Sequence, residues 1–180
     1  MQATEIDVRG EFARLHDVLD SFEALREEGD GALSARSPEV SGWSVEQHLY
    51  HIALATDLAF QHVRSLVRQK GGLIQSEGEL DPVAAAVLGR DLAERGAAKA
   101  PRIVTPDEEV NREFLAMEQR GNRETLGKLE EIADEIQGAP GWIPHQVLGP
   151  LRAAHWLRFA ALHARHHLAI VEDVRAASDG

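Results

Sequence analysis

The sequence contains no cysteine. Neither a disulfide framework nor thiolate metal ligation is therefore available, and no side chain of this protein can supply a thiol nucleophile. Positive charge is also scarce, because 19 Lys and Arg residues face 30 Asp and Glu residues, for a formal net charge of -11. Proteins that bind nucleic acid use clustered cations to displace counterions from phosphates. We therefore expect no nucleic-acid partner.

Long hydrophobic runs are absent as well. No stretch approaches the length of apolar sequence that spans a bilayer, and the opening segment "MQATEIDVRGEF" lacks the cations and the apolar run of a signal peptide. These features predict a cytoplasmic protein with no membrane partner. A chain of 180 residues with 43% hydrophobic residues is long enough for one compact core, which predicts a single domain over residues 1–180.

Apolar residues recur at three- and four-residue steps in four long segments, and strand patterns are scarce. This spacing is typical of helices with one buried face. We predict helices over residues 5–28, 44–69, 106–137 and 151–176. Four amphipathic helices of this length predict an all-α fold, a four-helix bundle.

Local sequence features suggest where these helices begin and end. Ser44 and Gln47 are spaced for a capping box at the start of the second helix, and Gly71 and Gly72 follow its end. Residues 71–106 form a long connection between helices two and three, with one short helix near residues 82–94. Gly121 interrupts the periodicity of the third helix, which leaves two alternatives, a kink or a glycine that the helix tolerates. The segment "GAPGWIPHQVLGP" is a loop rich in proline and glycine that leads to the fourth helix.

Three histidines lie close together in the apolar fourth helix. His163 and His167 are one helical turn apart and about 40° apart around the axis, whereas His166 points about 100° away from His167. A pair of histidines at this spacing can bind one divalent metal through ring nitrogens. Two half-buried, hydrogen-bonded histidines without a metal are the alternative.

A third imidazole is available from the start of the second helix. His51 shares a helix face with Ile52, Ala55, Leu58 and His62, which would turn it toward the interior. Three protein ligands that leave coordination positions open are typical of a catalytic metal site. The alternative is that His51 lies on the helix surface beside His48.

Two motifs carry a resemblance to a known family. The segment "WSVEQHLYHI", in which His51 follows Trp43 by eight residues, together with "HARHH", resembles the DinB-like superfamily of metal-binding four-helix bundles, also called YfiT-like. The similarity spans most of the chain. The segment "VLGPLRAAHWLRFAALHARHHLAIVEDV" is most similar to a subgroup without an assigned function.

The resemblance implies a divalent metal, zinc or nickel, held by three histidines. The matching positions are His51, His163 and His167, while His48, His62 and His166 match no ligand position. Many relatives follow the last histidine with Arg-Gly-Gln, but Leu-Ala-Ile follows it here. This difference removes a polar candidate next to the site. The resemblance further suggests a homodimer.

Some members of the superfamily use their metal to hold the sulfur of a low-molecular-weight thiol such as mycothiol or bacillithiol. This implies a metal-dependent enzyme, either a thiol-dependent S-transferase or a hydrolase, acting on a small molecule. A metal- or small-ligand-binding protein without turnover and a purely structural metal site are the alternatives. No catalytic residue is assigned, because we expect solvent exposure for the charged candidates Glu46, Asp57, Glu113, Arg158 and Arg165.

Overall fold

The computed structural model describes residues 6–91, 93, 95–96 and 99–178. Most of these residues are helical. The helices are α1 (Val8–Glu27), α2 (Asp30–Ser34), α3 (Val45–Arg68), α4 (Pro82–Leu88), α5 (Arg112–Glu130), α6 (Ala133–Gly138) and α7 (Ala153–Ser178), with one short 3-10 turn, η1 (Arg102–Val104). Within the described residues, no helix is both long enough and apolar enough to cross a membrane.

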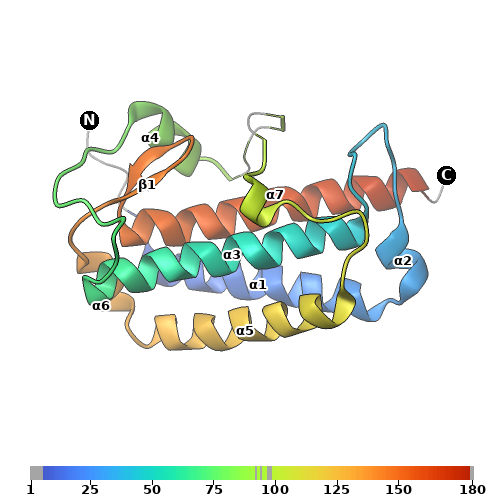
Figure 1. The fold of residues 1–180 in the computed structure, drawn as a ribbon, viewed down its shortest axis with the longest axis horizontal. Coiled ribbons are helices and arrows are strands. Elements are labelled where there is room, and N and C mark those ends of the chain that lie inside the picture. Colours follow the sequence, from blue (N-terminus) through green and yellow to red (C-terminus); the bar gives the residue numbers. More distant parts are fainter. Residues whose placement is uncertain (1–5, 92, 94, 97–98, 179–180) are drawn as a thin grey trace.

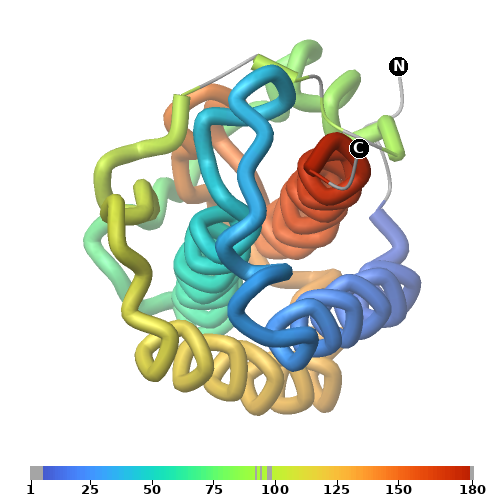
Figure 2. The backbone as a smooth tube through the Cα atoms, turned by 90° about the vertical axis from the view of Figure 1, so that its right-hand side faces the viewer, coloured from blue at the N-terminus to red at the C-terminus, as the bar shows by residue number. Residues whose placement is uncertain are grey.

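The long helices α1, α3, α5 and α7 lie side by side. Helices α1 and α7 run in one direction, and α3 and α5 run in the other (Figure 1). Helix α3 packs against α7 and α5, and α1 packs against the same two helices from the opposite side, as the end-on view in Figure 2 illustrates. The seam between α3 and α7 is the most extensive of these helix contacts.

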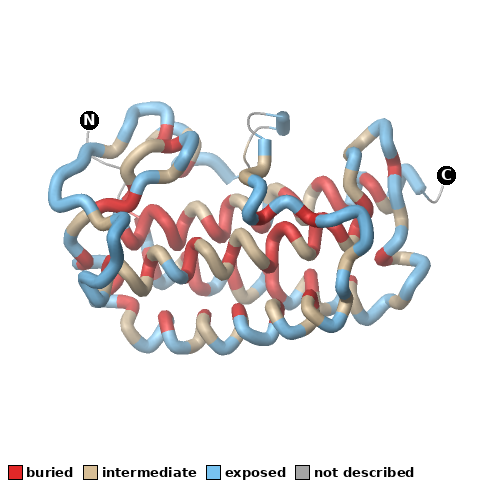
Figure 3. Tube along the Cα trace, in the orientation of Figure 1, coloured by how far each residue is buried: buried red, intermediate tan, exposed pale blue. Residues whose placement is uncertain are grey.

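The core lies between these helices. Leu15, Phe60, Leu126 and Leu157, one from each long helix, are almost completely buried. Each such side chain contributes about 1.5–3 kcal/mol through burial. Buried residues are most continuous along α3 and α7 (Figure 3). These two helices therefore form the buried centre of the molecule.

Helix α3 begins and ends close to where the sequence predicts. The Ser44 side chain accepts a hydrogen bond from the Gln47 amide, and the Gln47 side chain accepts one from the Ser44 amide, so the capping box is confirmed. At the other end Gln69, with φ of 52°, makes the left-handed turn that closes the helix. Gly71 and Gly72 follow only after the helix has ended.

The predicted third helix is wrong in its extent. Residues before Asn111 are not part of it, because the Asn111 side chain caps the amide of Phe114 and starts α5 there. The helix runs through Gly121 without interruption, so the glycine is tolerated there, and the helix breaks at Ile132, where φ is -114°. No glycine or proline lies at this break, and the apolar periodicity continues across it. The sequence pattern therefore predicts one helix where the structure has two.

The proline- and glycine-rich loop contains a strand pair that we did not predict. Strands β1 (Ile143–His145) and β2 (Gly149–Leu151) pair antiparallel, with Pro144 opposite Pro150. Proline has no N–H to donate to a ladder, so two prolines in strands of three residues conceal the strand pattern.

The connection between α3 and α5 is fastened to this hairpin. Gln75 and Trp142 exchange two backbone hydrogen bonds of 2.8 and 2.9 Å. Helix α4 is shorter than predicted and ends at Leu88. The predicted ends at Glu5 and Glu94 lie outside the described residues. The long connection thus returns to the α3–α7 seam and covers it.

Candidate metal centre

Three imidazoles converge on one point in the seam between α3 and α7. His51 comes from α3, and His163 and His167 come from successive turns of α7. One ring nitrogen from each lies within 4.8 Å of the others. The Nε2 atoms of His51 and His163 are 3.3 Å apart. Two nitrogens bound at about 2.05 Å to a tetrahedral ion would be separated by about 3.3 Å, so this pair has the spacing of metal ligands.

A backbone carbonyl orients His51. Its Nδ1 lies 2.8 Å from the carbonyl oxygen of Val104, in the 3-10 turn that covers the seam. Because a carbonyl can only accept, Nδ1 carries the proton and donates it. In a neutral ring this leaves the lone pair on Nε2, the atom that faces His163.

Hydrogen bonds between side chains lead from Ser41 through His48 to His167. Its Nδ1 lies 2.9 Å from Nδ1 of His48, and Nε2 of His48 lies 2.9 Å from Oγ of Ser41. Ser41 Oγ also accepts a hydrogen bond from the amide of Trp43. When His48 donates to Ser41, its Nδ1 accepts from His167, and the lone pair of His167 is then on Nε2, free for a metal. The sequence showed no role for His48, since that role depends on a residue 119 positions away.

Aromatic rings hold the three imidazoles from both sides. Trp43 lies over the cluster with ring-centroid distances of 5.0 Å to His51 and 6.2 Å to His167, and is stacked on the latter. Phe159 is stacked on His163 at 5.2 Å. The capping box therefore lies between two residues of the site. Trp43, just before it, packs over the cluster, and His51, one turn after it, belongs to the cluster.

Burial keeps all three imidazoles neutral. Desolvation is the main cause that lowers the pKa of His51, His163 and His167 below the usual value of 6.5, and neighbouring histidines lower the pKa of His163 and His167 further. Neutral imidazole is the form that binds metals. Donor type, spacing and protonation state all fit a divalent ion, so the described residues form a cluster that can hold one.

Comparison with known families agrees with this geometry. The family model described as the DinB superfamily matches residues 10–171, which include all three histidines. The chain belongs to the DinB superfamily. It has no significant match among curated proteins or among solved structures.

The histidine cluster of this DinB superfamily member opens into a large cavity. The cavity has a volume of about 840 Å³ and extends along the seam between α3 and α7, under the connection and the hairpin. Its lining includes His51, His163 and His167, and most of the other lining side chains are apolar. A ligand can therefore reach the side of the cluster that the protein leaves uncovered.

Other histidines line the same cavity without joining the cluster. His166 is half-buried, with its ring 5.1 Å from that of His167, and His62 lies 4.4 Å from the ring of Trp156. His145, at the end of β1, contacts Phe159 at 4.5 Å. The hairpin brings His145 to the cavity, and sequence reasoning missed this residue because it missed the hairpin.

The charged candidates have varied environments. Glu113 and Arg165 are exposed, Asp57 is half-exposed, and Glu46 pairs with Arg112 at 2.7 Å with only 15% of its side chain accessible. None of these four lines the cavity in the described part of the chain.

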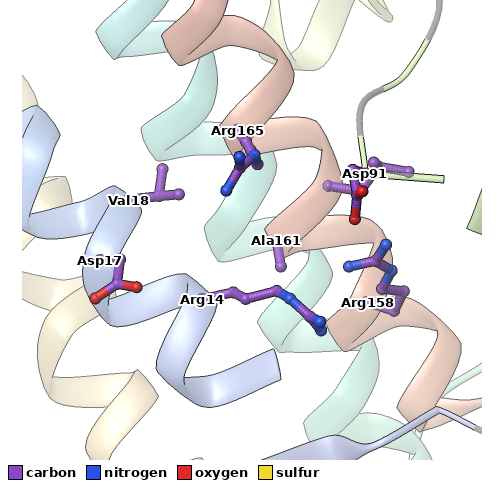
Figure 4. Close-up of a pocket in the computed structure, with 8 residues that line it drawn as sticks. Arg14, Asp17, Val18, Asp91, Arg158, Ala161 and Arg165 are labelled. Carbon is purple, nitrogen blue, oxygen red and sulfur yellow. The ribbon is translucent and has the colours of Figure 1, made fainter. Parts of the chain in front are cut away.

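The expectation for Arg158 is wrong. It is 7% exposed, pairs with buried Glu11 at 3.2 Å, and donates to the carbonyl oxygen of Leu88 at 2.9 Å. Figure 4 shows it in a small polar pocket between α1 and α7, with Arg14 and Asp91 nearby. Helical spacing places Arg158 away from the histidine face, and there it meets α1 and the connection instead of solvent.

Proposed function

We propose that this protein is a divalent-metal-dependent enzyme, a four-helix bundle of the DinB type whose ligands are His51, His163 and His167. The observation that carries this proposal is the cluster of three neutral imidazoles facing a cavity. A structural ion is usually enclosed by four protein ligands, whereas three ligands beside a cavity leave room for a substrate.

The bound metal would lower the pKa of a thiol or a water molecule and so supply a nucleophile at neutral pH. The protein's own residues orient the site. Val104 and His48 hold the rings of His51 and His167, and Trp43 and Phe159 stack on His167 and His163. Because the chain has no cysteine, a thiol would come from a small molecule. Thiol-dependent S-transfer and hydrolysis are the two reactions that this arrangement supports.

A binding protein without turnover is the second candidate. It is favoured by one observation, that no Asp or Glu is found among the described residues that line the cavity. A carboxylate is a common general base in metal hydrolases. Among the described lining residues, the histidines and Lys99 are the side chains that could move a proton.

Zinc titration against a competing chelator tests the metal site. We expect the protein to bind about one zinc ion per chain. His51→Ala, His163→Ala and His167→Ala should each weaken binding by more than about a hundredfold, beyond what loss of an orienting residue causes. His166→Ala is the matched control, since it removes a histidine from the same cavity and should retain the affinity. Loss of binding in the control with retention in His167→Ala would show that the ligand set is wrong.

Turnover distinguishes the two candidates. The zinc-loaded protein is mixed with a low-molecular-weight thiol and an electrophile, and thiol consumption is followed. An enzyme should consume the thiol faster than the His163→Ala variant does. Zinc binding with equal rates for both proteins would favour the binding protein.

A further inference from the structure

The cavity beside the histidine cluster is lined by basic residues, although the chain as a whole is acidic. The protein carries a net charge of -11, yet no carboxylate is found among the described lining residues. The charged residues that line the cavity are Arg90, Arg95 and Lys99. Arg95 pairs with Asp173 on α7 at 2.5 Å. Lys99 is exposed and makes no ion pair within the described part of the chain. The charged side chains among the described lining residues are thus all cationic, and since Arg95 already pairs with a carboxylate, an anion would meet opposite charge mainly at Lys99.

The cavity continues from the cluster as an apolar arm. We use this name for the part lined by Ala55 and Leu58 of α3, Leu148 of the hairpin, and Trp156 and Phe159 of α7. His163 and Trp156 are seven residues apart on one helix, so the arm extends about 10 Å from the cluster. Aromatic walls of this kind favour a flat apolar group, which can stack on Trp156 or Phe159.

Beside the arm, the cavity is also lined by His145 and His62, and His145 offers an uncharged hydrogen-bond donor. Nδ1 of His145 accepts hydrogen bonds from the amides of Val147 and Leu148, both at 3.1 Å, so the proton of the neutral ring is on Nε2. Burial lowers the pKa of His145 to about 4 and also lowers that of His62. Near neutral pH the arm therefore carries no charge.

We propose that this cavity takes an amphipathic organic anion, with an apolar, preferably aromatic body in the arm and its anionic group near Lys99. This inference names the ligand class of the proposed metal site and rests on the proposed function for the ligand's role as a substrate. The selectivity itself comes from the cavity lining and can be measured without any metal.

Three probes with one shape and different charge test the preference. The protein is freed of metal with a chelator and titrated calorimetrically with 4-phenylbutyrate, 4-phenylbutanol and 4-phenylbutylamine near pH 7. The carboxylate should bind at least about fivefold tighter than the alcohol, the effect of one charge contact at about 4 Å in water, and the ammonium should bind weakest. If none of the three binds, or if all bind equally, the inference is wrong.

Two variants locate the two ends of the ligand. Lys99→Glu should remove the preference for the carboxylate, and Lys128→Glu, the same change at an exposed site on α5, should not. Ala55→Leu fills part of the arm and should weaken all three probes by about tenfold, the effect of a lost apolar contact worth about 1.4 kcal/mol. Ala176→Leu on the exposed end of α7 is its control. Retention of the carboxylate preference in Lys99→Glu would overturn the placement of the anionic group.

Measurement on the metal-free protein separates this inference from the proposed function. A carboxylate can itself bind zinc, so a preference seen only after zinc loading would come from the metal and would contradict the inference. Conversely, the expected order of probes in a protein that fails to bind zinc would support the cavity's selectivity and leave the metal-dependent function refuted.

Discussion

At the scale of single residues, the hydrogen-bond partner on the far side of His51 and of His167 decides which of their ring nitrogens faces the metal position. Val104 does this for His51 through a carbonyl, and His48 does it for His167 through another imidazole. A carbonyl permits one tautomer only, whereas His48 can donate or accept. The His48 contact therefore depends on Ser41, because Nδ1 of His48 is free to accept from His167 when Nε2 donates a hydrogen bond to Oγ of Ser41.

Replacement of His48 tests this chain of hydrogen bonds. We expect His48→Ala to weaken zinc binding about tenfold to a hundredfold, the range typical for partners of metal ligands. His48→Asn should recover part of the loss, because its side-chain oxygen can accept from His167. Chelator competition measures both variants. A His48→Ala protein with unchanged affinity would show that His167 needs no partner.

At the scale of secondary-structure elements, Arg158 joins α7 to two other segments. Its guanidinium pairs with Glu11 of α1 and donates to the carbonyl oxygens of Leu88 and Arg90, at the end of α4. Glu11 is 3% exposed and also binds Arg14. One side chain thus holds the middle of the connection between α3 and α5 against α1 and α7.

Removal of Arg158 should therefore destabilise the whole protein. Arg158→Met leaves buried Glu11 with one partner fewer and should lower the free energy of unfolding by about 3 kcal/mol or more. The double variant Arg158→Met, Glu11→Leu should regain part of this loss, because no buried charge is then left. Urea denaturation measures both.

A surface ion pair provides the control for Arg158. Arg9 and Asp134 are 72% and 91% exposed, so Arg9→Met should change stability little. An Arg158→Met protein as stable as this control would mean that the buried pair contributes nothing.

At the scale of the whole molecule, buried neutral histidines couple folding to pH. Burial lowers the pKa of His145 and His155 from 6.5 to about 4, and Arg152 adds to the effect at His155. In the unfolded chain these rings would take up protons near pH 6.5. Below that pH the unfolded state therefore binds more protons than the folded state, and acid favours unfolding.

The metal-free protein should consequently lose stability as the pH falls from 6.5 toward 4. Each such histidine contributes a slope of up to about 1.4 kcal/mol per pH unit within this window. Urea denaturation at pH 7, 6 and 5 measures the slope, and His145→Gln should reduce it by the share of one histidine. A stability that does not change between pH 6.5 and 5 would contradict the burial of these rings in the neutral form.

Sequence reasoning succeeded where the cause is local. The capping box of Ser44 and Gln47 depends on residues three apart, and the common face of His163 and His167 depends on four. It failed at the break near Ile132 and at the hairpin. Neither feature has a local marker, since the break lacks glycine and proline and the strands contain two prolines.

The sequence by itself determined a mostly helical chain, its membership of the DinB superfamily, and which histidines share a helix face, because helix periodicity and capping act between near neighbours. Only the tertiary structure decided that His48 contacts His167, that Val104 orients His51, and that Arg158 is buried. These contacts join residues 53 to 147 positions apart. Such residues are brought together by the packing of the whole chain, because local conformational preferences act only between near neighbours.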